Sequence, residues 1–600
     1  MPQFLSPGVV VEEVQGKNAT IPASSTSAMA LAGYSTRGPE GKATVTTNFT
    51  EFVRRFGSFS SKSMNTYAVA AYFQNGGNRV WFVRELASDA TFAEGVFTGT
   101  WDVKASGRGS WANGGEVSIS GNPSFFNGET GEYSRFDFTV EIINPNTGLL
   151  EITEQFEALD LVDEESPDYI TKVLEVGSED IILSAISGGI PAGMSPTPFS
   201  GVVLGAGDGT TVLFNASVSG NAPILEGSCV FKVNGVQVAI DNGLGSIQDD
   251  IGGASVSGTV NYQTGAVSIF VSPAVVSGNI TIDGITRGAD SVTVVLAGGS
   301  DGSVVQSSDV IGAGVKALGR GIYALDEVNE QFALALPDFA GDSTTESLLV
   351  TYAEERQDIV ALVQPPKGSN PQEAIAYRRK TLGGQSSYAA MYYPWVKVPD
   401  PLNRNRPKTV PPAGHIAGRY AYTDITENVG KAPAGVNRGQ LRFLSGVERV
   451  LTKGDRDSLY PAQVNPIVSD DSIGVAIFGN KTLQVVGDFT DVNIRRTFIN
   501  LRKEQEAGLV DILFENIGPA TFSLIVARLD QYLEGKFLAG VIGSGVPLKE
   551  QAFKVVCDET NNPESIQIQK RIVIDEFIKP NLAAEFIHLR LQRVFDASEA

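Results

Sequence analysis

The sequence predicts a multidomain protein of the α/β and α+β classes, in which an α/β layer carries β-rich insertions. Three observations predict this class. The chain has 600 residues, more than one hydrophobic core usually organises. Strand-like and helical patterns alternate on both sides of a long central region. The central region is dominated by Gly, Ser, Thr and Val, a composition typical of β-strands joined by tight turns.

The first α/β segment follows a strand-like run at residues 8–14 and a polar linker. Residues 28–34 form an apolar run, which predicts a strand that ends in a turn. Helical stretches are predicted at residues 50–56 and 64–74, and residues 79–84 predict a buried strand. This order of elements predicts one half of a layered α/β domain.

The same alternation resumes in a second segment. Ser343 and Glu346 form a capping-box pattern that predicts the start of a helix. Asn370 and Glu373, with a proline between them, predict the start of another. Strands are predicted at residues 332–336, 358–363 and 386–393. Strands that alternate with helices predict a largely parallel sheet.

Other patterns fill the rest of the chain. Residues 136–143 alternate between apolar and polar, which predicts a strand, and short Val, Ile and Thr runs at 201–284 predict a small β-sandwich. Apolar residues recur at helical spacing over residues 520–539. The basic residues Arg495 and Arg496 lie on a helix-like stretch and are interpreted as a solvated face.

These patterns divide the chain into domains and arms. The two α/β segments form one domain, from which the β-rich segments are insertions. The predicted parts are an N-terminal strand arm with its linker (1–22), the α/β domain (23–101 and 300–393), a β-rich insertion (102–200), a β-sandwich insertion (201–290), a mixed inner α+β domain (394–565) and a C-terminal strand arm (566–600).

The charge balance argues against nucleic acid and membranes as partners. The formal net charge is −22, from 68 acidic and 46 basic residues, and a surface of this sign repels phosphate. No uncharged apolar run reaches about 18 residues, so we expect no membrane insertion. The first residues lack the basic start and apolar run of a signal peptide, so the protein is expected to stay in the cytoplasm where it is made.

No catalytic, cofactor-binding or metal-binding residues are predicted. Residues 298–302 match the G-x-S-x-G elbow of hydrolases, but no convincing helix follows Ser300, so a turn is favoured. Glycine-rich segments lack the strand and helix that dinucleotide binding needs. Cys229, Cys557 and two histidines are too few for a disulfide framework, and a zinc site would need all four to converge.

Several sequence motifs occur in a definite order along the chain. Near the start these are Pro-Gly-Val-Val-Val-Glu-Glu at 7–13, Phe-Thr-Glu-Phe at 49–52, Tyr-Phe-Gln-Asn-Gly-Gly at 72–77 and Val-Trp-Phe-Val-Arg at 80–84. The C-terminal half adds segments at 387–395, 410–418, 431–435 and 479–483. Together they resemble the contractile tail sheath family of phages and related injection machines. Lys481 stands where members of that family more often carry Arg.

The resemblance implies a mechanical function and no enzymatic one. Subunits of this family stack as hexameric rings around a tail tube and rearrange to drive the tube through the host envelope. The implied partners are other copies of the chain, the tail tube protein, and the baseplate and tail terminator proteins, with no cofactor. The implied location is the tail sheath of the virion, after assembly in the bacterial host cytoplasm. The domain at 394–565 is expected to face the tube.

Both terminal segments are predicted to be strand arms that pair with neighbouring subunits. Apolar and polar residues alternate over residues 586–592. Pairing of both ends within their own subunit fits the pattern equally well, and the resemblance favours exchange. The residues expected in the shared sheet are Val9, Val10, Val11, Ile587, Leu589 and Leu591.

Three alternatives stay open from the sequence. One is the sheath of a bacteriocin or secretion-type injection machine, which the neighbouring genes would distinguish. Another is a β-rich serine hydrolase, which would lose activity on substitution Ser300→Ala. The last is an adhesin, which would remain discrete in solution instead of forming rings or tubes.

Overall fold

The computed structural model describes residues 21–143, 148–249, 255–275, 277–380, 382 and 385–590. The chain forms two compact units. The first unit contains the chain up to Ser35, Gly41–Glu85 and everything from Val305 onward, and the second contains Thr36–Glu40 and Leu86–Val304. The second unit is therefore an insertion into the first.

The first unit is built on a sheet that has eight strands in the described ranges, in the order β2-β3-β1-β21-β22-β23-β27-β28. Their bounds are β1 Ala28–Gly33, β2 Thr44–Thr46, β3 Arg79–Arg84, β21 Phe332–Ala335, β22 Ile359–Val363, β23 Ala389–Tyr393, β27 Val464–Asp470 and β28 Gly474–Ile477. All pairs from β3 to β27 are parallel, and β2 and β28 pair antiparallel at the edges. The predicted largely parallel sheet is confirmed.

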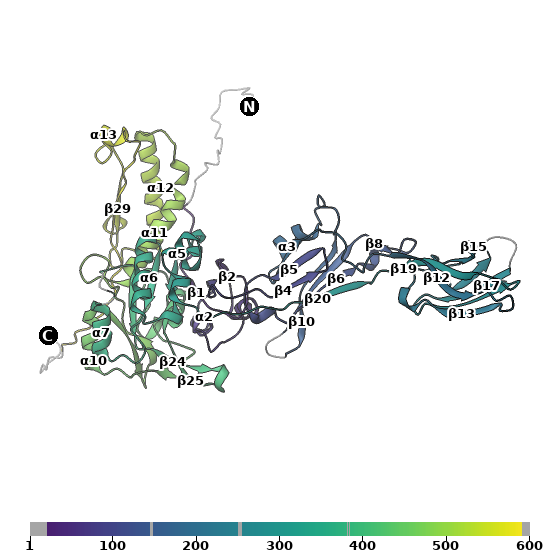
Figure 1. Ribbon diagram of the computed structural model, residues 1–600. Helices are drawn as coiled ribbons and strands as arrows, with labels where there is room; N and C mark the ends of the chain where they lie inside the picture. The colour runs from purple at the N-terminus through teal and green to yellow at the C-terminus, as the bar shows by residue number, and fades with distance from the viewer. Residues whose placement is uncertain are drawn as a thin grey trace, which may run out of the picture. The chain divides into compact units, whose positions relative to one another are not determined.

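Helices cover both faces of this sheet (Figure 1). Ala28 and Ala30 of β1 pack on the side of α6 (Ser343–Arg356) and α7 (Pro371–Lys380). Met29 and Leu31 pack on the other side, where α1, α2 and α8 lie (Phe49–Phe56, Asn65–Gln74 and Ala413–Thr426). Because both faces are buried, the four central strands β1, β21, β22 and β23 consist of apolar residues throughout, which is why they read as continuous apolar runs.

Hydrogen bonds between residues close in sequence determine where helices α7 and α6 begin. The Glu373 N–H donates to Asn370 Oδ1 at 3.0 Å, and the Asn370 N–H donates to the Glu373 carboxylate at 2.8 Å, so this predicted capping box is confirmed. The other predicted capping box, which has Ser343 as its cap residue, is wrong in that residue. Helix α6 is capped by Asp342, whose carboxylate accepts from the Thr345 N–H at 2.9 Å, and Ser343 is its first helical residue.

Helices α2 and α8 approach each other closely. A Cβ atom on Gly414 would lie 2.0 Å from the Ala68 carbonyl oxygen, and one on Gly418 would lie 2.7 Å from the Tyr72 carbonyl oxygen. Both positions therefore need glycine for steric reasons. Both belong to the 410–418 segment singled out in the sequence.

The sheet continues past the domain boundary predicted at residue 394. Strand β27 pairs in parallel with β23, with Val464 opposite Met391. Pro466 lies inside β27, and proline within an apolar run argues against a central strand, so the pattern does not predict this one. Part of the predicted inner domain thus belongs to the α/β sheet.

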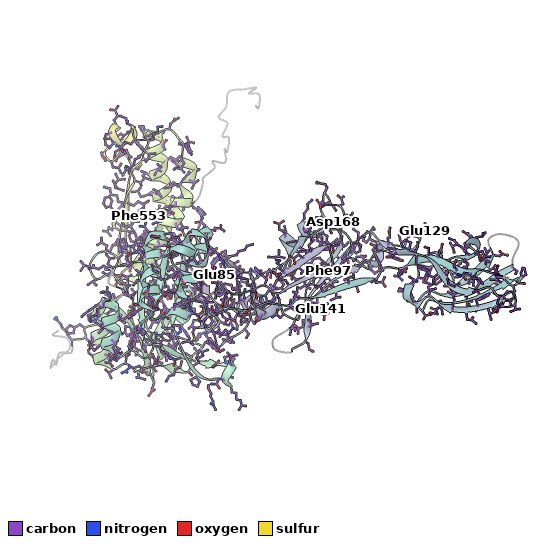
Figure 2. The ribbon with its side chains drawn as sticks, viewed as in Figure 1. Glu85, Phe97, Glu129, Glu141, Asp168 and Phe553 are labelled. Atoms are coloured by element: carbon purple, nitrogen blue, oxygen red, sulfur yellow. The ribbon has the colours of Figure 1, made fainter. Side chains whose placement is uncertain are left out.

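Two long helices, α11 (Val492–Gly508) and α12 (Pro519–Leu538), follow the sheet. The helix predicted at 520–539 is confirmed by α12, whose buried residues are Phe522, Ile525, Leu529 and Leu533. Strand β29 (Phe553–Val556) runs beside α12, and Phe553 shares a core with Leu533 (Figures 1 and 2). Shorter elements of this unit are β24 Val396–Asp400, β25 Arg406–Val410, β26 Gly446–Val447, α4 Ser307–Val310, α5 Ala313–Ala317, α9 Gly435–Arg438, α10 Lys453–Leu459 and α13 Glu564–Gln567.

The second unit begins with β-structure around Phe97 and Trp101, which are fully buried (Figure 2 labels Phe97). The sheets have the orders β10-β9-β6-β20 and β11-β5-β4. The strand predicted at 136–143 is confirmed as β9. The bounds are β4 Glu94–Phe97, β5 Trp101–Ala105, β6 Glu116–Gly121, β9 Phe136–Ile143, β10 Leu150–Leu159, β11 Ile181–Ala185, β20 Ser291–Val295 and α3 Ile170–Gly177.

Residues 197–286 form a second β module in this unit. The described strands make one antiparallel sheet in the order β12-β19-β14-β15-β16-β17-β18-β13, around a core that includes Phe231 and Ile269. The predicted two-sheet sandwich is not confirmed, because the hydrogen bonding is continuous. Thr197 pairs with Thr286, so the module's two ends lie side by side. The bounds are β12 Thr197–Ala206, β13 Leu213–Ser217, β14 Val230–Val233, β15 Val236–Asp241, β16 Ser246–Asp249, β17 Ser255–Asn261, β18 Ala266–Ser272 and β19 Asn279–Thr286.

Candidate functional site

The candidate functional site comprises the points at which the two terminal segments are attached to the first unit. At the C-terminal side, β30 (Asp575–Ile578) pairs antiparallel with β29, and this sheet has two strands within the described residues. Asn581 follows and is 6% exposed. Its side chain accepts from the Ser544 N–H and donates to the Gly540 carbonyl, both at 2.8 Å. The segment is thereby fixed just after β30.

Glu585 provides a second attachment point. Lys481 Nζ lies 3.0 Å from the Glu585 carboxylate, and the Tyr460 hydroxyl donates to it at 2.7 Å. Burial, together with this hydrogen bond to a carboxylate, raises the pKa of Tyr460 well above its usual value, so the hydroxyl stays a donor. Residues 581–585 are therefore held at both ends.

Beyond Glu585 the large apolar side chains are mostly exposed. Phe586 is 83% exposed, Ile587 92% and Leu589 75%. Residues 581–590 form no strand. Ile587 and Leu589 thus lie on a segment without secondary structure that pairs with no strand of the described chain. Of the other residues predicted for the arms, Val9, Val10, Val11 and Leu591 lie outside the described residues.

The N-terminal segment is attached along helix α11. Ile21 packs so closely that a Cβ on Gly508 would lie 2.4 Å from its Cγ1 atom. The Ser24 N–H donates to the Glu504 carboxylate at 2.9 Å. Arg496 donates to the Thr26 carbonyl at 3.2 Å. The attachment is spread over three turns of the helix.

Glu504 is the most heavily hydrogen-bonded of these groups. It accepts from Tyr532 at 2.6 Å and from Asn500 at 3.0 Å, and Lys536 Nζ lies 2.7 Å away. Burial alone would raise the pKa of Glu504, but the hydrogen bonds from Lys536, Tyr532 and the Ser24 N–H outweigh it, and the pKa is lowered. The carboxylate is therefore charged and links α11, α12 and the N-terminal segment.

Helix α11 also contacts the C-terminal segment. Asn493, in its first turn, donates to the Asn581 carbonyl at 3.0 Å. Gln505, in its last turn, donates to Glu576 of β30 at 2.9 Å. One helix thus joins the attachment points of both terminal segments. No sequence motif indicated this role, because each contact joins residues far apart in the chain.

The interpretation of Arg495 and Arg496 as a solvated face is wrong. Arg496 is 3% exposed and donates to Asp424 at 3.0 Å. Arg495 is 9% exposed, with its guanidinium carbon 3.6 Å from the centroid of the Phe489 ring. Arg496 is buried because Asp424, distant in sequence, pairs with its charge, and Arg495 is buried between the nearby Phe489 ring and the ring of Tyr388, which is distant in sequence.

Residues 318–483 match the family described as phage tail sheath protein central domain. This range includes Tyr460 and Lys481, the two residues that bind Glu585. This segment is similar to the central domain of phage tail sheath proteins. The tail sheath protein of Vibrio phage KVP40 is 32% identical over 255 residues, and that of Enterobacteria phage T4 is 30% identical over 268 residues. The matches cover 39% and 41% of this chain and 36% and 38% of those relatives, so the chain spans well under half of their length.

Two solved sheath proteins share the fold over nearly the whole chain. The contracted helical sheath of the anti-feeding prophage has a TM-score of 0.51 at 16% identity, and covers 99% of this chain and 100% of its own. The sheath tail protein of Listeria innocua has a TM-score of 0.50 at 10% identity, and covers 93% of each chain. These likenesses show the fold of the sheath domain and of the parts around it.

The sequence motifs of the sheath domain serve packing and attachment. Gly414 and Gly418 allow the close contact of α8 with α2. The Lys481 N–H donates to Asn465 Oδ1 at 2.7 Å, which positions the lysine that binds Glu585. The motifs thus mark positions where a larger or different side chain would disturb the fold or the arm.

The chemical motifs have structural explanations. Ser300 forms an isolated antiparallel β-bridge with Thr91, its Oγ accepts from the Gly302 N–H at 3.2 Å, and the next helix begins only at Ser307. The nucleophile elbow needs a helix immediately after the serine, and none follows Ser300, although the residue lies in a bridge and not in the turn that the sequence predicts. Burial raises the pKa of the Cys229 thiol to about 12, and Cys557 is also buried and free.

The described part of the chain meets the requirements of neither a metal site nor a membrane-spanning helix. No group of three or more His, Cys, Asp and Glu side chains there is placed to hold a metal ion. No helix in the same ranges is long and apolar enough to cross a membrane.

Proposed function

We propose that the chain is the structural subunit of a contractile tail sheath. Copies polymerise as stacked hexameric rings around a tail tube, and contraction drives the tube through the host envelope. The observation that carries this proposal is the sheath domain at residues 318–483, which itself holds the C-terminal arm through Tyr460 and Lys481. The role is mechanical and requires neither a catalytic residue nor a cofactor.

The partners follow from this role. They are other copies of the chain, the tail tube protein, and the baseplate and tail terminator proteins. Assembly takes place in the bacterial host cytoplasm, and the product is part of the virion. The residues from 394 to 565 face the tube, while the β-rich insertion, which leaves and re-enters the first unit, decorates the outside.

Strand exchange holds the copies together while they move. Each arm leaves from a fixed attachment point and adds a strand to the β29–β30 sheet of a neighbour. A two-stranded sheet is marginally stable in water, so added strands complete it. Phe577 of β30, which is 61% exposed, supports this choice because an added strand would shield it.

Two truncations test the arms. Removing residues 1–16 keeps the attachment at Ile21, Ser24 and Thr26, and removing residues 586–600 keeps the attachment at Glu585. We expect both shortened chains to melt at the temperature of the intact chain and to form no rings or tubes in negative-stain electron microscopy.

A deeper truncation is the matched control. Removing everything after Pro580 also removes the Asn581 contacts, at about 1 kcal/mol for each hydrogen bond, so its melting temperature should fall. Tubes formed by the chains that lack residues 1–16 or 586–600 would contradict the donated arms. A lower melting temperature of those two chains would show that the arms pair within their own subunit.

The second candidate is the sheath of a bacteriocin or secretion-type injection machine. It is favoured by the fold likeness to the anti-feeding prophage sheath over 99% of the chain. The genes beside this one distinguish the two candidates, because a phage supplies capsid genes and an injection machine supplies effector genes.

A further inference from the structure

An exposed aromatic residue lies in the turn between α11 and α12. Phe514 is 106% exposed, and its backbone lies in the left-handed region with φ 71°. A bulky residue is strained in that conformation. Phe443 also has a positive φ, 58°, but its ring packs against the core on one face of the sheet. Phe514 has no packing of this kind among the described residues.

The turn that carries Phe514 is held in place. Ile512 and Ile517 pack against the core under α12. Arg528 donates to the Gly508 carbonyl at 2.8 Å and forms an ion pair with Asp511. The strained Phe514 is thus displayed by a fixed support. We call residues 509–518 the Phe514 turn.

A groove of about 670 Å³ lies beside the attachment of the C-terminal arm. We call it the arm-root groove. It is lined by residues within 430–438, 453–460, 478–480 and 581–586. Phe478, which is 37% exposed, and Leu582, which is 74% exposed, give it apolar surface. Its volume falls within the roughly 300–1,000 Å³ of pockets that enclose a ligand.

Polar groups in the arm-root groove lack partners within the described residues. Asn480 is 3% exposed, and its Oδ1 atom accepts no hydrogen bond. Arg456 Nε is buried and donates none. The side chains of Lys431 and Arg456 form no ion pair in the described chain, so the groove is basic.

We propose that the Phe514 turn of one copy of this chain docks in the arm-root groove of a second copy. The turn offers an aromatic side chain and the carboxylate of Glu515, and its other carboxylate, Asp511, is already paired with Arg528; no Lys or Arg lies between residues 509 and 518. The groove offers apolar surface and the positive charges of Lys431 and Arg456. The two surfaces are therefore complementary in each of these respects.

The contact has a geometric consequence. Turn and groove are different surfaces, so the contact is heterologous and propagates into rings or helices instead of closing as a dimer. It rests on the proposed function, since it requires an assembly of copies. It adds a docked contact to the strand arms and touches residues 581–586, from which the C-terminal arm leaves.

Photo-crosslinking of the full chain tests the contact. With p-benzoylphenylalanine placed at Phe514, irradiation of the assembled protein should link one copy to the groove segments 430–438, 453–460 or 581–586 of another, as read by mass spectrometry. Links to other segments, or no links in assembled particles, would overturn the contact alone. A chain that stays monomeric at every concentration would overturn both this contact and the proposed function.

Substitutions give an independent readout. Phe514→Gly removes the ring and relieves the backbone strain, so the melting temperature should hold or rise, while the critical concentration for assembly should increase about tenfold or more, as for an interface hot spot. Leu244→Gly, at a residue 88% exposed in the β module, is the matched control and should leave assembly unchanged. Equal effects of the two variants would overturn the proposal.

Charge reversal completes the test. Glu515→Lys and Arg456→Glu should each weaken assembly, because each places like charges across the contact. The two changes combined should recover part of the loss. If the combined variant assembles less well than either single variant, the pairing of these two surfaces is contradicted.

Discussion

Replacing Glu504 with alanine should release the N-terminal segment and destabilise the first unit. The substitution leaves Tyr532 and the Ser24 N–H without their acceptor and removes the ion pair of Lys536, whose Nζ keeps its hydrogen bond to Asn500 Oδ1 at 3.1 Å. Breaking a buried ion pair costs about 3–5 kcal/mol. The Lys536 side chain is 19% exposed and can regain some hydration, so we expect a loss of unfolding free energy of about 3 kcal/mol, near the lower end of that range.

Glu506→Ala on the same helix is the matched control. Glu506 pairs with Arg502 at the surface, where the side chains are 56% and 41% exposed, so its loss should cost less than about 0.5 kcal/mol. Urea unfolding followed by far-ultraviolet circular dichroism measures both variants. Proteolysis within residues 21–27 should also accelerate in the Glu504 variant alone. Equal stability of the two variants would refute the assigned network.

The pH dependence of Glu504 has a definite sign. Its pKa is lowered in the folded chain, so its stabilisation is present above the unfolded pKa, about 4.3, and is lost as the pH falls through the folded value. The difference in unfolding free energy between the wild type and Glu504→Gln should therefore shrink as the pH falls below about 4.3. A difference that is constant across this range would contradict the charged state assigned to Glu504.

Three further predictions concern other parts of the chain. Burial raises the pKa of Glu346 from 4.5 to about 8, so stability should fall as the pH rises between these values, and Glu346→Gln should reduce that slope in urea unfolding at several pH values. Gly414→Ala should destabilise the chain by more than about 2 kcal/mol through the clash with Ala68, whereas Gly535→Ala, with nothing within 4 Å, should stabilise by about 1 kcal/mol, both measured by chemical denaturation. Excising residues 197–286 with a short Gly/Ser join should leave ring or tube formation intact in electron microscopy, because Thr197 and Thr286 are paired neighbours.

Features governed by local sequence could be predicted. The Asn370–Glu373 capping box and the apolar face of α12 depend on residues within a few positions of one another. Strand β27 could not be predicted in the same way. It contains Pro466, and its place beside β23 is set by a partner far away in the chain.

The attachment points of the arms show the same limit. Arg496 is buried because Asp424 pairs with it, and nothing near Arg496 in the sequence indicates that partner. The alternation through Ile587 and Leu589 is visible in the sequence, but a strand needs a neighbouring strand, and the pattern does not name one. The partner that stabilises Arg496 is a tertiary one, and Ile587 and Leu589 have no strand partner among the described residues.

Helix α11 sets the direction in which force travels through the subunit. Its contacts to the N-terminal segment, from Arg496 to Gly508, extend over roughly 18 Å of helix, and Asn493 at its start holds the C-terminal segment. Tension on the N-terminal segment along the helix therefore loads several contacts at once, in shear, instead of peeling them apart singly. In the proposed assembly, a pull on the arms of successive copies would therefore be carried along helix α11 of each copy and not through the eight-stranded sheet and its cores.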